Sequence, residues 1–296
     1  MKKVVNHISE LIGETPLFKL TKLVPQGAAD VYVKLESLNV GRSIKDRVVL
    51  NILEVAEEQG RISPSDTVVE VTDGNASLSL AMLAASKGYR SILMMPAGSS
   101  QDFSEKLAYY DAEIIETPAE EGIEGAIKAA RDLSQQEGYF YLNQYSNLAN
   151  TAVHEGMTGP EIVDAFDGHS PDAFVATAGT GGTLTGVGRY LRSVNPNVEL
   201  YAVESNQAAL LSNDDTGRVS ISGMSGDYLS PLLDQTLYNG VVRVSLEEVH
   251  QTTQDLARLE GLLLGPASGA AIAGAIEIAK RLGSGKKVVT ISNGDY

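Results

Sequence analysis

From residue 31 onward, the chain alternates short runs rich in Val, Ile and Tyr with longer stretches whose apolar residues recur at helical spacing. This alternation is typical of repeated strand–helix–strand units built around a parallel sheet. The expected strands span residues 31–35, 67–72, 91–95, 113–116, 140–145, 173–177, 199–204, 241–245 and 288–292. A helix over residues 46–59 would place Val48, Ile52 and Val55 on one face. The sequence therefore predicts an α/β fold.

Charge and hydropathy limit the partners of the chain. Its 296 residues include 23 basic and 38 acidic side chains, a net charge of -15, and the basic ones are scattered rather than gathered in a stripe. We therefore expect no binding to nucleic acid or to an anionic membrane. No apolar run approaches the roughly 18 residues of a membrane span, and Met1-Lys2-Lys3 leads into polar sequence instead of a signal-peptide core. These features predict a cytoplasmic protein whose partners are small molecules.

Residue types that are missing or dispersed narrow the chemistry further. The chain contains no cysteine, which removes disulfides, thiol nucleophiles and thiolate metal sites. The histidines are far apart in the sequence, and we expect surface or core-edge positions and no metal site for them: His7, His154, His169 and His250. Residues 206–240 break the rhythm of strands and helices. Because long loops in compact enzymes are often functional, this segment is an active-site loop candidate.

A glycine-rich loop follows the strand that is expected to end near Thr177, and it opens a helix that runs towards Leu191. Its residues are Gly179, Thr180, Gly181, Gly182 and Thr183. Glycine lets backbone N–H groups converge, and a helix N-terminus adds partial positive charge, so such a loop suits a phosphate. The alternative is a plain tight turn. The spacing is neither G-x-G-x-x-G nor G-x-x-x-x-G-K-[ST], so a phosphate monoester fits better than a nucleotide.

A lysine stands at the start of the expected helix, in the segment S-I-K-D-R at residues 43–47, shortly after Gly41. Partial burial and the helix-start dipole both lower the pKa of a lysine, which favours the neutral amine that forms a Schiff base. Taken alone, Lys45 is one lysine among others. A third segment, T-D-G-N-A-S at residues 72–77, again joins a strand end to a helix start. Thr72 and Asn75 could present polar groups to a ligand there, or simply cap the helix.

The glycine-rich loop, the lysine segment and the segment 72–77 follow one another in a definite order along the chain. Further motifs belong to the same series. The additional motifs are I-G-E-T-P-L at 12–17, V-Y-V-K-L-E-S at 31–37, M-T-G-P-E-I at 157–162, A-G-T-G-G-T-L-T-G-V-G-R-Y-L at 178–191 and G-P-A-S-G-A-A at 265–271. Over almost its whole length, the chain resembles the cysteine synthase (O-acetylserine sulfhydrylase) and cystathionine β-synthase family. The resemblance implies the tryptophan synthase β-like fold of pyridoxal-phosphate enzymes, fold type II, in which helices flank two parallel or mostly parallel twisted sheets.

The resemblance also implies how the chain is divided and what it binds. A length of 296 residues with 43% apolar residues suits two domains. By the resemblance, residues 36–146 form a smaller, mobile N-terminal domain, and residues 1–35 and 147–296 form a larger domain with the phosphate-binding loop. The family implies a homodimer. Family members also bind the C-terminal tail of serine acetyltransferase in the active-site cleft, a partnership against which Asp73 and Ala76 count.

The implied cofactor is pyridoxal 5'-phosphate, and the resemblance gives roles to single residues. Lys45 would hold the cofactor as an internal aldimine and move the Cα proton. The loop from Gly179 to Thr183 would bind the phosphate, and Asn75 the ring hydroxyl. The substrate side would consist of Thr72, Asp73, Gly74, Asn75, Ala76 and Gln144, with Thr72 and Gln144 gripping the α-carboxylate. The implied reaction is β-elimination or β-replacement on a serine- or cysteine-like amino acid through an aminoacrylate, with sulfide, a thiol or water as nucleophile.

Two departures from the family's pattern lie close to cofactor and substrate. The substrate segment commonly reads T-S-G-N-T-G, whereas here Asp73, Ala76 and Ser77 replace a serine, a threonine and a glycine. Asp73 either faces the substrate, where its charge would oppose the carboxylate, or points outward and caps the following helix. The serine that usually meets the pyridine nitrogen is Ala267 here. Ser268, one residue on and about 100° around the helix, is the candidate in its place.

Two further departures lie in loops. The long segment reads G-M-S-G-D-Y at 223–228 where the family often has G-I-G-A-G-F, so Asp227 stands where a glycine faces the substrate. A carboxylate there could act as a general base on a thiol or water, and the alternative is a solvated loop aspartate. After Met95 and Pro96 the family usually has S-x-E-R, but residues 100–103 read S-Q-D-F, without the arginine.

Three functions follow from this pattern. The leading one is cysteine synthase-like β-replacement. The second is a cysteine lyase that releases hydrogen sulfide and adds water to give L-serine, with Asp227 as the base. The third is a non-catalytic, pyridoxal-phosphate-binding regulatory homologue, against which the retention of Lys45, Asn75 and Gln144 argues.

Overall fold

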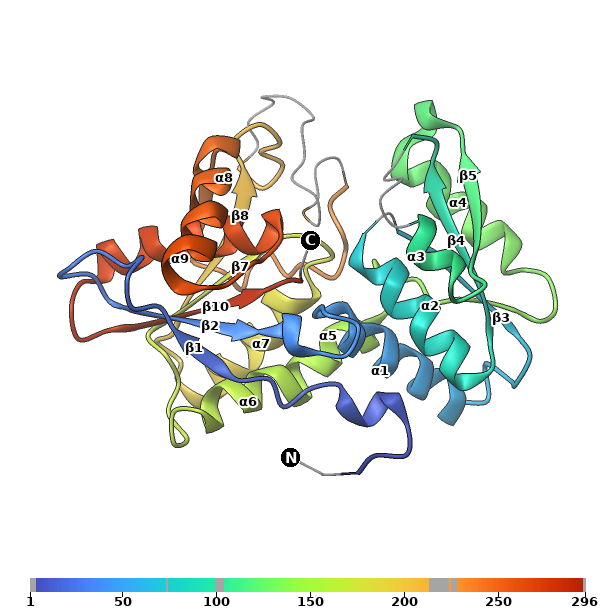
Figure 1. The fold of residues 1–296 in the computed structure, drawn as a ribbon, viewed down its shortest axis with the longest axis horizontal. Coiled ribbons are helices and arrows are strands. Elements are labelled where there is room, and N and C mark those ends of the chain that lie inside the picture. Colours follow the sequence, from blue (N-terminus) through green and yellow to red (C-terminus); the bar gives the residue numbers. More distant parts are fainter. Residues whose placement is uncertain (1–3, 73, 99–103, 213–223, 225–227, 295–296) are drawn as a thin grey trace. The chain divides into compact units, whose positions relative to one another are not determined.

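The computed structural model contains residues 1–296 and describes residues 4–72, 74–98, 104–212, 224 and 228–294. The chain separates into two compact units. The first unit comprises Met1–Ile12, Asn39–Gly41 and Lys45–Asn150. The second unit comprises Gly13–Leu38, Arg42–Ile44 and Thr151–Tyr296. Figure 1 follows the elements of each unit along the chain.

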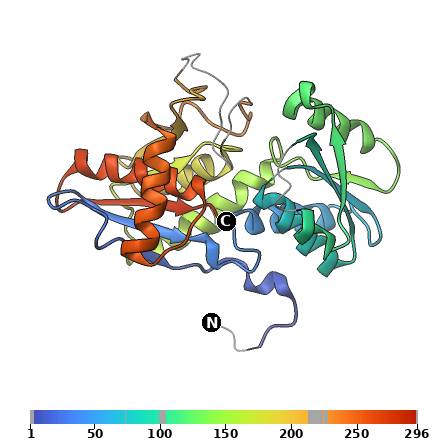
Figure 2. The ribbon, with the colours of Figure 1, turned by 45° about the horizontal axis from the view of Figure 1, so that its top comes forward.

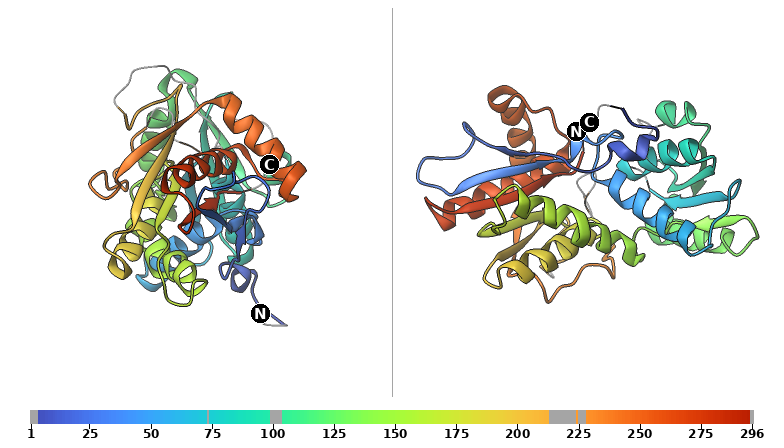
Figure 3. Two further views of the ribbon diagram at one scale, coloured as in Figure 1. Left: turned by 90° about the vertical axis from the view of Figure 1, so that its left-hand side faces the viewer. Right: turned by 90° about the horizontal axis from the view of Figure 1, so that it is seen from below.

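The first unit is built on a four-stranded parallel sheet with the strand order β5-β4-β3-β6. Its strands are β3 (Thr67–Val71), β4 (Arg90–Pro96), β5 (Glu113–Thr117) and β6 (Tyr139–Tyr141). Its main helices are α1 (Lys45–Glu58), α2 (Asn75–Lys87), α3 (Ser104–Ala108) and α4 (Gly122–Leu133). Helices α2 and α4 pack on opposite faces of the sheet, and α1 packs against α2 (Figure 3). All of β3 is therefore buried, as expected for an inner strand of a covered parallel sheet.

The second unit is built on a six-stranded sheet with the order β1-β2-β10-β7-β8-β9. Its strands are β1 (Leu17–Lys19), β2 (Asp30–Leu35), β7 (Ala173–Thr177), β8 (Glu199–Ser205), β9 (Gly240–Val244) and β10 (Lys287–Ser292). Only the β1–β2 pairing is antiparallel among these strands. The covering helices are α6 (Gly159–Asp164), α7 (Gly182–Val194), α8 (Leu246–Asp255) and α9 (Pro266–Leu282). Figure 2 shows α9 crossing the sheet on the side that α8 shares, while α6 and α7 lie on the other side.

Alternating side chains of the central strands fill two cores, one on each face of this sheet. Val175 and Val203 pack towards α8 and α9. Phe174 and Leu200 pack towards α6 and α7. Successive residues of a strand point to opposite faces, so the run A-F-V-A of β7 is continuously apolar because both faces are covered. This is why the continuous apolar runs of the sequence correspond to inner strands.

The expected α/β fold, with two mostly parallel sheets flanked by helices, is confirmed. Each expected strand is present, and apart from the end of β6 its ends coincide with the expected ones or differ by one residue. The main difference is β6, which ends at Tyr141 instead of residue 145, because Asn143 adopts a left-handed conformation with φ of 57° and the chain turns away. The three-residue antiparallel strand β1 was not expected, since it is too short to show an alternating pattern.

The remaining elements are short, and several belong to one continuous helical run. They are η1 (Ile8–Leu11), η2 (Glu36–Leu38), η4 (Ala119–Glu121), α5 (Leu148–Val153), the π-turn η5 (His154–Thr158) and the π-turn η6 (Leu256–Glu260). Elements α5, η5 and α6 follow one another without a break. Within the described part of the chain, we find no helix of the length and apolar character that crossing a membrane requires.

Candidate active site

Lys45 is the first residue of α1 and is partly buried. Burial lowers the pKa of its amine to about 8, and the nearby Glu70 carboxyl group works in the opposite direction. The direction agrees with the expectation for a lysine at the start of a packed helix. A lysine with such a pKa is neutral in a substantial fraction of molecules near pH 8, which suits it to form a Schiff base or to accept a proton.

The first turn of α1 is held by Asp46, the neighbour of Lys45, which is fully buried. Its Oδ2 accepts the backbone N–H of Gly41 at 2.6 Å, and its Oδ1 accepts the hydroxyl of Ser79 in α2 at 2.5 Å. A side chain at position 41 would collide with this carboxylate, so glycine is required there. The aspartate of S-I-K-D-R therefore fixes the backbone on which Lys45 stands.

The segment after β3 turns at once into α2. Gly74 is the N-cap of α2 and supplies no side-chain cap, while its N–H donates to Thr72 Oγ1 at 3.3 Å. Thr72 and Ala76 are buried, whereas Gly74 and Asn75 are partly exposed. Ser77 turns its hydroxyl back to the Gly74 carbonyl at 2.5 Å. The structure thus places Thr72, Gly74, Asn75 and Ala76 around the start of one helix.

Gln144 lies beside the end of the same strand, in the loop that follows β6. It is 2% exposed, and its Nε2 donates to the Val71 carbonyl at 3.2 Å. Its backbone N–H donates to Glu70 Oε2 at 2.9 Å, and its carbonyl accepts from Asn150 Nδ2 at 2.7 Å. Gln144 and Thr72, which are far apart in the sequence, are therefore brought to one edge of the sheet.

In the second unit, the glycine-rich loop begins after β7 and leads directly into α7. Gly181 is the N-cap of this 13-residue helix, with φ of 76° and no side-chain cap. Helix geometry leaves the first N–H groups of α7 without intrahelical acceptors. An added Cβ at Gly181 would lie 2.7 Å from Leu233 Cα and 2.8 Å from Leu233 N, so this position requires glycine for both space and conformation.

A buried histidine contacts Thr183, the last residue of this loop. His154, in the π-turn η5, is 0% exposed, so the expected surface or core-edge position is wrong for it. Its Nε2 lies 3.3 Å from Thr183 Oγ1, and its Nδ1 lies 3.0 Å from Thr158 Oγ1. A π-turn inserts one extra residue into a helix and often marks a functional position. The other histidines, His7, His169 and His250, are exposed.

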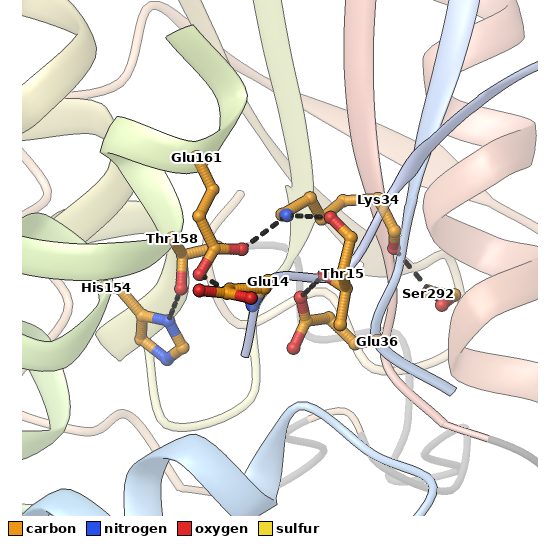
Figure 4. Close-up of polar contacts among 8 residues, drawn as sticks. All are labelled: Glu14, Thr15, Lys34, Glu36, His154, Thr158, Glu161 and Ser292. Atoms are coloured by element: carbon orange, nitrogen blue, oxygen red, sulfur yellow. Dashed lines mark hydrogen bonds and ion pairs between the residues drawn. The ribbon is translucent and has the colours of Figure 1, made fainter. Parts of the chain in front are cut away.

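Three of the sequence motifs, to which no chemical role has been given, contribute to a buried polar cluster in the second unit, which Figure 4 shows. Lys34 Nζ donates to Glu161 Oε2 at 2.5 Å and to the carbonyl of Thr15. Thr15 Oγ1 in turn donates to Glu36 Oε1 at 2.6 Å. The cluster therefore joins I-G-E-T-P-L, V-Y-V-K-L-E-S and M-T-G-P-E-I, and anchors the α5–η5–α6 run that carries His154.

Ser268 occupies the first turn of α9, where its hydroxyl binds the end of β10. Its Oγ accepts the N–H groups of Asn293 at 2.9 Å and Gly294 at 3.4 Å, and it donates to the Gly294 carbonyl at 3.2 Å. A hydroxyl has one donor and two acceptor sites, so these bonds use its capacity. A contact between Ser268 and the pyridine nitrogen stays a prediction, which this arrangement does not favour.

Some expected site residues lie outside the described residues. They are Asp73, Asp227 and the segment 100–103, together with residues 213–223 and 225–226 of the candidate loop 206–240. Their expected roles stay predictions. Glu70, by contrast, was not expected at the site. Its signal in the sequence is an acidic residue inside the otherwise apolar strand T-V-V-E-V.

Each unit, taken by itself, provides one feature that suits pyridoxal phosphate. The first unit offers an amine of lowered pKa at Lys45 and, at α2, a helix start with polar side chains. The second unit offers the N-terminus of α7, whose N-cap is a glycine without a side-chain cap and whose first N–H groups are donors that suit a phosphate. Among the described residues, no group of three or more acidic or histidine side chains is placed to hold a metal ion.

Known proteins resemble the chain along its whole length. Residues 8–294 match the family described as pyridoxal-phosphate dependent enzyme. The cysteine synthase of Staphylococcus aureus strain N315 is 43% identical over 296 residues, which cover 99% of this chain and 96% of that protein.

Two solved structures show the same similarity in three dimensions. O-ureido-L-serine synthase superimposes with a TM-score of 0.94 at 34% identity, covering 99% of this chain and 92% of the other. A hydrogen sulfide-producing enzyme from Fusobacterium nucleatum gives a TM-score of 0.92 at 30% identity, covering 99% of this chain and 98% of the other.

Proposed function

The chain belongs to the family of pyridoxal-phosphate dependent enzymes, and we propose that it replaces the leaving group on Cβ of a serine-like amino acid by sulfide, as a cysteine synthase does. The reaction class is β-replacement, and pyridoxal phosphate is the cofactor. The bound cofactor supplies an electron sink for the carbanion at Cα. The side chains of this chain supply the orientation and the proton transfers.

In this proposal, Lys45 both holds the cofactor and moves the proton at Cα of the substrate. The observation that carries it is the lowered pKa of Lys45, about 8, at the first residue of a buried helix start. An amine with the usual lysine pKa is almost entirely protonated at neutral pH and cannot accept a proton. Desolvation at this helix start removes that obstacle.

The substrate carboxylate is assigned to the edge of the first unit's sheet. Thr72 Oγ1 and the amide of Gln144 are hydrogen-bonding groups at this edge, and the start of α2 beside them favours negative charge. The phosphate is assigned to the loop from Gly179 to Thr183, with Thr183 held by His154. Asn75 is assigned to the cofactor's ring hydroxyl.

The products of the purified protein test the proposed reaction. Supplied with O-acetylserine and sulfide, it is expected to release cysteine and acetate, which mass spectrometry identifies. Serine and sulfide formed from cysteine alone would select the water-adding reaction instead, and no product from either mixture would reject both. Asp227 would then be tested as its base by Asp227→Gly.

A chemical trap tests the role of Lys45 separately from activity. Borohydride reduction followed by peptide mass spectrometry is expected to place the phosphopyridoxyl group on Lys45. Lys45→Ala should remove both the label and the activity. Lys87→Ala is the matched control, because Lys87 ends α2 and pairs with Glu57 at 3.0 Å, away from the helix starts. A label on another lysine would contradict the assignment.

The proposal extends to the assembly and to the place where the enzyme works. We expect a homodimer in the cytoplasm, with residues 36–146 moving as a smaller domain. Light scattering should give twice the mass of one chain, and a monomer would contradict this part of the proposal alone.

A further inference from the structure

The hydrogen-bond ladder between β3 and β6 stops just before the proposed substrate edge. The parallel register runs from Thr67 opposite Tyr139 to Val69 opposite Tyr141, and the Leu142 N–H donates to the Val69 carbonyl at 2.9 Å. The next residue, Asn143, has φ of 57° and turns the chain out of the strand direction. Past this point, backbone groups of the two segments need other partners, because buried backbone N–H groups are rarely left unpaired.

The side chain of Glu70 provides those partners. It is 0% exposed, its Oε1 accepts the Val71 N–H at 2.6 Å, and its Oε2 accepts the Gln144 N–H at 2.9 Å. The Gln144 side chain returns the contact by donating from Nε2 to the Val71 carbonyl at 3.2 Å. One carboxyl group thus extends the ladder by a further step with side-chain bonds.

Burying the carboxyl group of Glu70 costs free energy of folding, which indicates that this side chain has a specific role. Burial raises the pKa of Glu70 to about 8, although the N–H groups of Gln144 and Val71 and the charge of Lys45 act to lower it. A carboxylate offers two acceptor oxygens and no donor. A glutamine would turn its NH2 group towards one of the two N–H groups, and an aspartate would be too short to bridge both.

We propose that Glu70 is a positioning residue for the substrate carboxylate, because it fixes Gln144 against the end of β3 next to Thr72. The proposal rests on the proposed function, in which Gln144 binds that carboxylate. Glu70 does not itself touch substrate or cofactor in this account. It acts through the backbone of Gln144, and it adds a residue to the site that the glycine loop and the lysine segment do not reveal.

Glu70→Gln tests this role, with Glu57→Gln as the matched control. Glu57 lies in the same unit and accepts from Lys87 and from Tyr89 at 3.0 Å, away from the β3 edge. In Glu70→Gln, KM for the amino-acid substrate should rise about tenfold, which corresponds to about 1.4 kcal/mol of binding free energy. At a pH above the acidic limb of the pH–kcat profile, the value of kcat should change less than threefold, because the lost interaction is equal in ground and transition states.

Hydrogen exchange separates positioning from the function on which it rests. In Glu70→Gln, backbone exchange in a peptide covering residues 142–146 should become at least tenfold faster, while a peptide covering residues 179–183 should be unchanged. If wild-type protein makes no product, the proposed function fails, yet this measurement still reports whether Glu70 holds Gln144. If Glu70→Gln does not fold, Glu70→Asp takes its place with the same expectations.

Two results would overturn the proposal. Unchanged exchange at 142–146 would show that Glu70 does not hold Gln144. Faster exchange with an unchanged KM would show that the position of Gln144 does not matter for the substrate. A lower kcat with unchanged KM is the mark of a merely structural residue, since it reflects fewer active molecules, and it would also reject the positioning role.

Discussion

Lys34 Nζ lies 2.5 Å from Glu161 Oε2, and this ion pair joins β2 to the start of α6 across 127 positions of the sequence. The Lys34 side chain is 1% exposed and that of Glu161 is 19% exposed. The other oxygen of Glu161 accepts the Glu14 N–H at 3.1 Å. Lys34 and Glu161 therefore keep different interactions when the other residue of the pair is replaced.

Glu161→Gln is expected to destabilise the protein more than Lys34→Met. Removing the Glu161 carboxylate takes a counter-charge away from a buried ammonium group, which costs about 3 kcal/mol of unfolding free energy. Removing the lysine leaves a carboxylate that still reaches solvent and the Glu14 N–H, so the loss is smaller. Urea unfolding measures both. Lys286→Met, which breaks the exposed pair with Asp172, is the control and should change little. Equal losses at Lys34 and Glu161 would contradict the argument.

Gly181→Ala should reduce the cofactor content of the purified protein. The substitution forces an L-residue into a conformation with φ of 76° and drives Cβ into the backbone of Leu233, which shifts the start of α7. Gly261→Ala is the matched control, since Gly261 has φ of 75° but nothing within 4 Å of an added Cβ. The control should lose only about 1–2 kcal/mol of stability from backbone strain.

Visible absorbance per chain measures the cofactor content of both glycine variants, and urea unfolding measures their stability. Only Gly181→Ala should lose cofactor. An equal loss in Gly261→Ala would show that general destabilisation, not the phosphate loop, is responsible.

His154→Ala should weaken cofactor binding about fivefold, which corresponds to the loss of one hydrogen bond of about 1 kcal/mol. The physical reason is that His154 Nε2 lies 3.3 Å from Thr183 Oγ1 and thereby orients a residue of the proposed phosphate loop. Cofactor titration into protein stripped of pyridoxal phosphate gives the dissociation constant. His250→Ala, at an exposed position of α8, should leave this constant unchanged. The same constant in both variants would remove His154 from the site.

The parts of the fold that sequence predicts are those set by local pattern. Covered inner strands read as apolar runs, so β3 and β7 were placed within a residue of their ends. The glycine-rich loop at Gly181 is visible because a strand end followed by a helix start is itself a local signal, whereas Lys45 stands out only through the order of the motifs around it. The predicted end of β6 is wrong, because nothing in the residues around Asn143 indicates that its backbone adopts a left-handed conformation.

The interactions that sequence does not predict join distant segments. The sequence predicts a position near the surface for His154, because a π-turn cannot be recognised from residue spacing and its partner Thr183 is 29 positions away. Lys34 and Glu161 both lie in motifs that are visible in the sequence, but neither motif indicates that these two residues form an ion pair. Glu70 is visible in the sequence as an acidic residue within a buried strand. That Gln144 is its partner, however, follows only from the order of the strands in the sheet.

The activity is expected to fall below about pH 8, because only the neutral amine of Lys45 accepts the proton from Cα. Burial sets the pKa of Lys45 at about 8, so kcat should drop about tenfold for each pH unit below that value. Glu70, whose own pKa is about 8, raises the pKa of Lys45 to the extent that its carboxyl group is charged, so replacing Glu70 is expected to lower the pKa of Lys45. The acidic limb of the pH–kcat profile should therefore move to lower pH in Glu70→Gln and stay in place in Glu57→Gln. A limb that moves to higher pH in Glu70→Gln, or moves equally in both variants, would show that Lys45 does not titrate under the influence of Glu70.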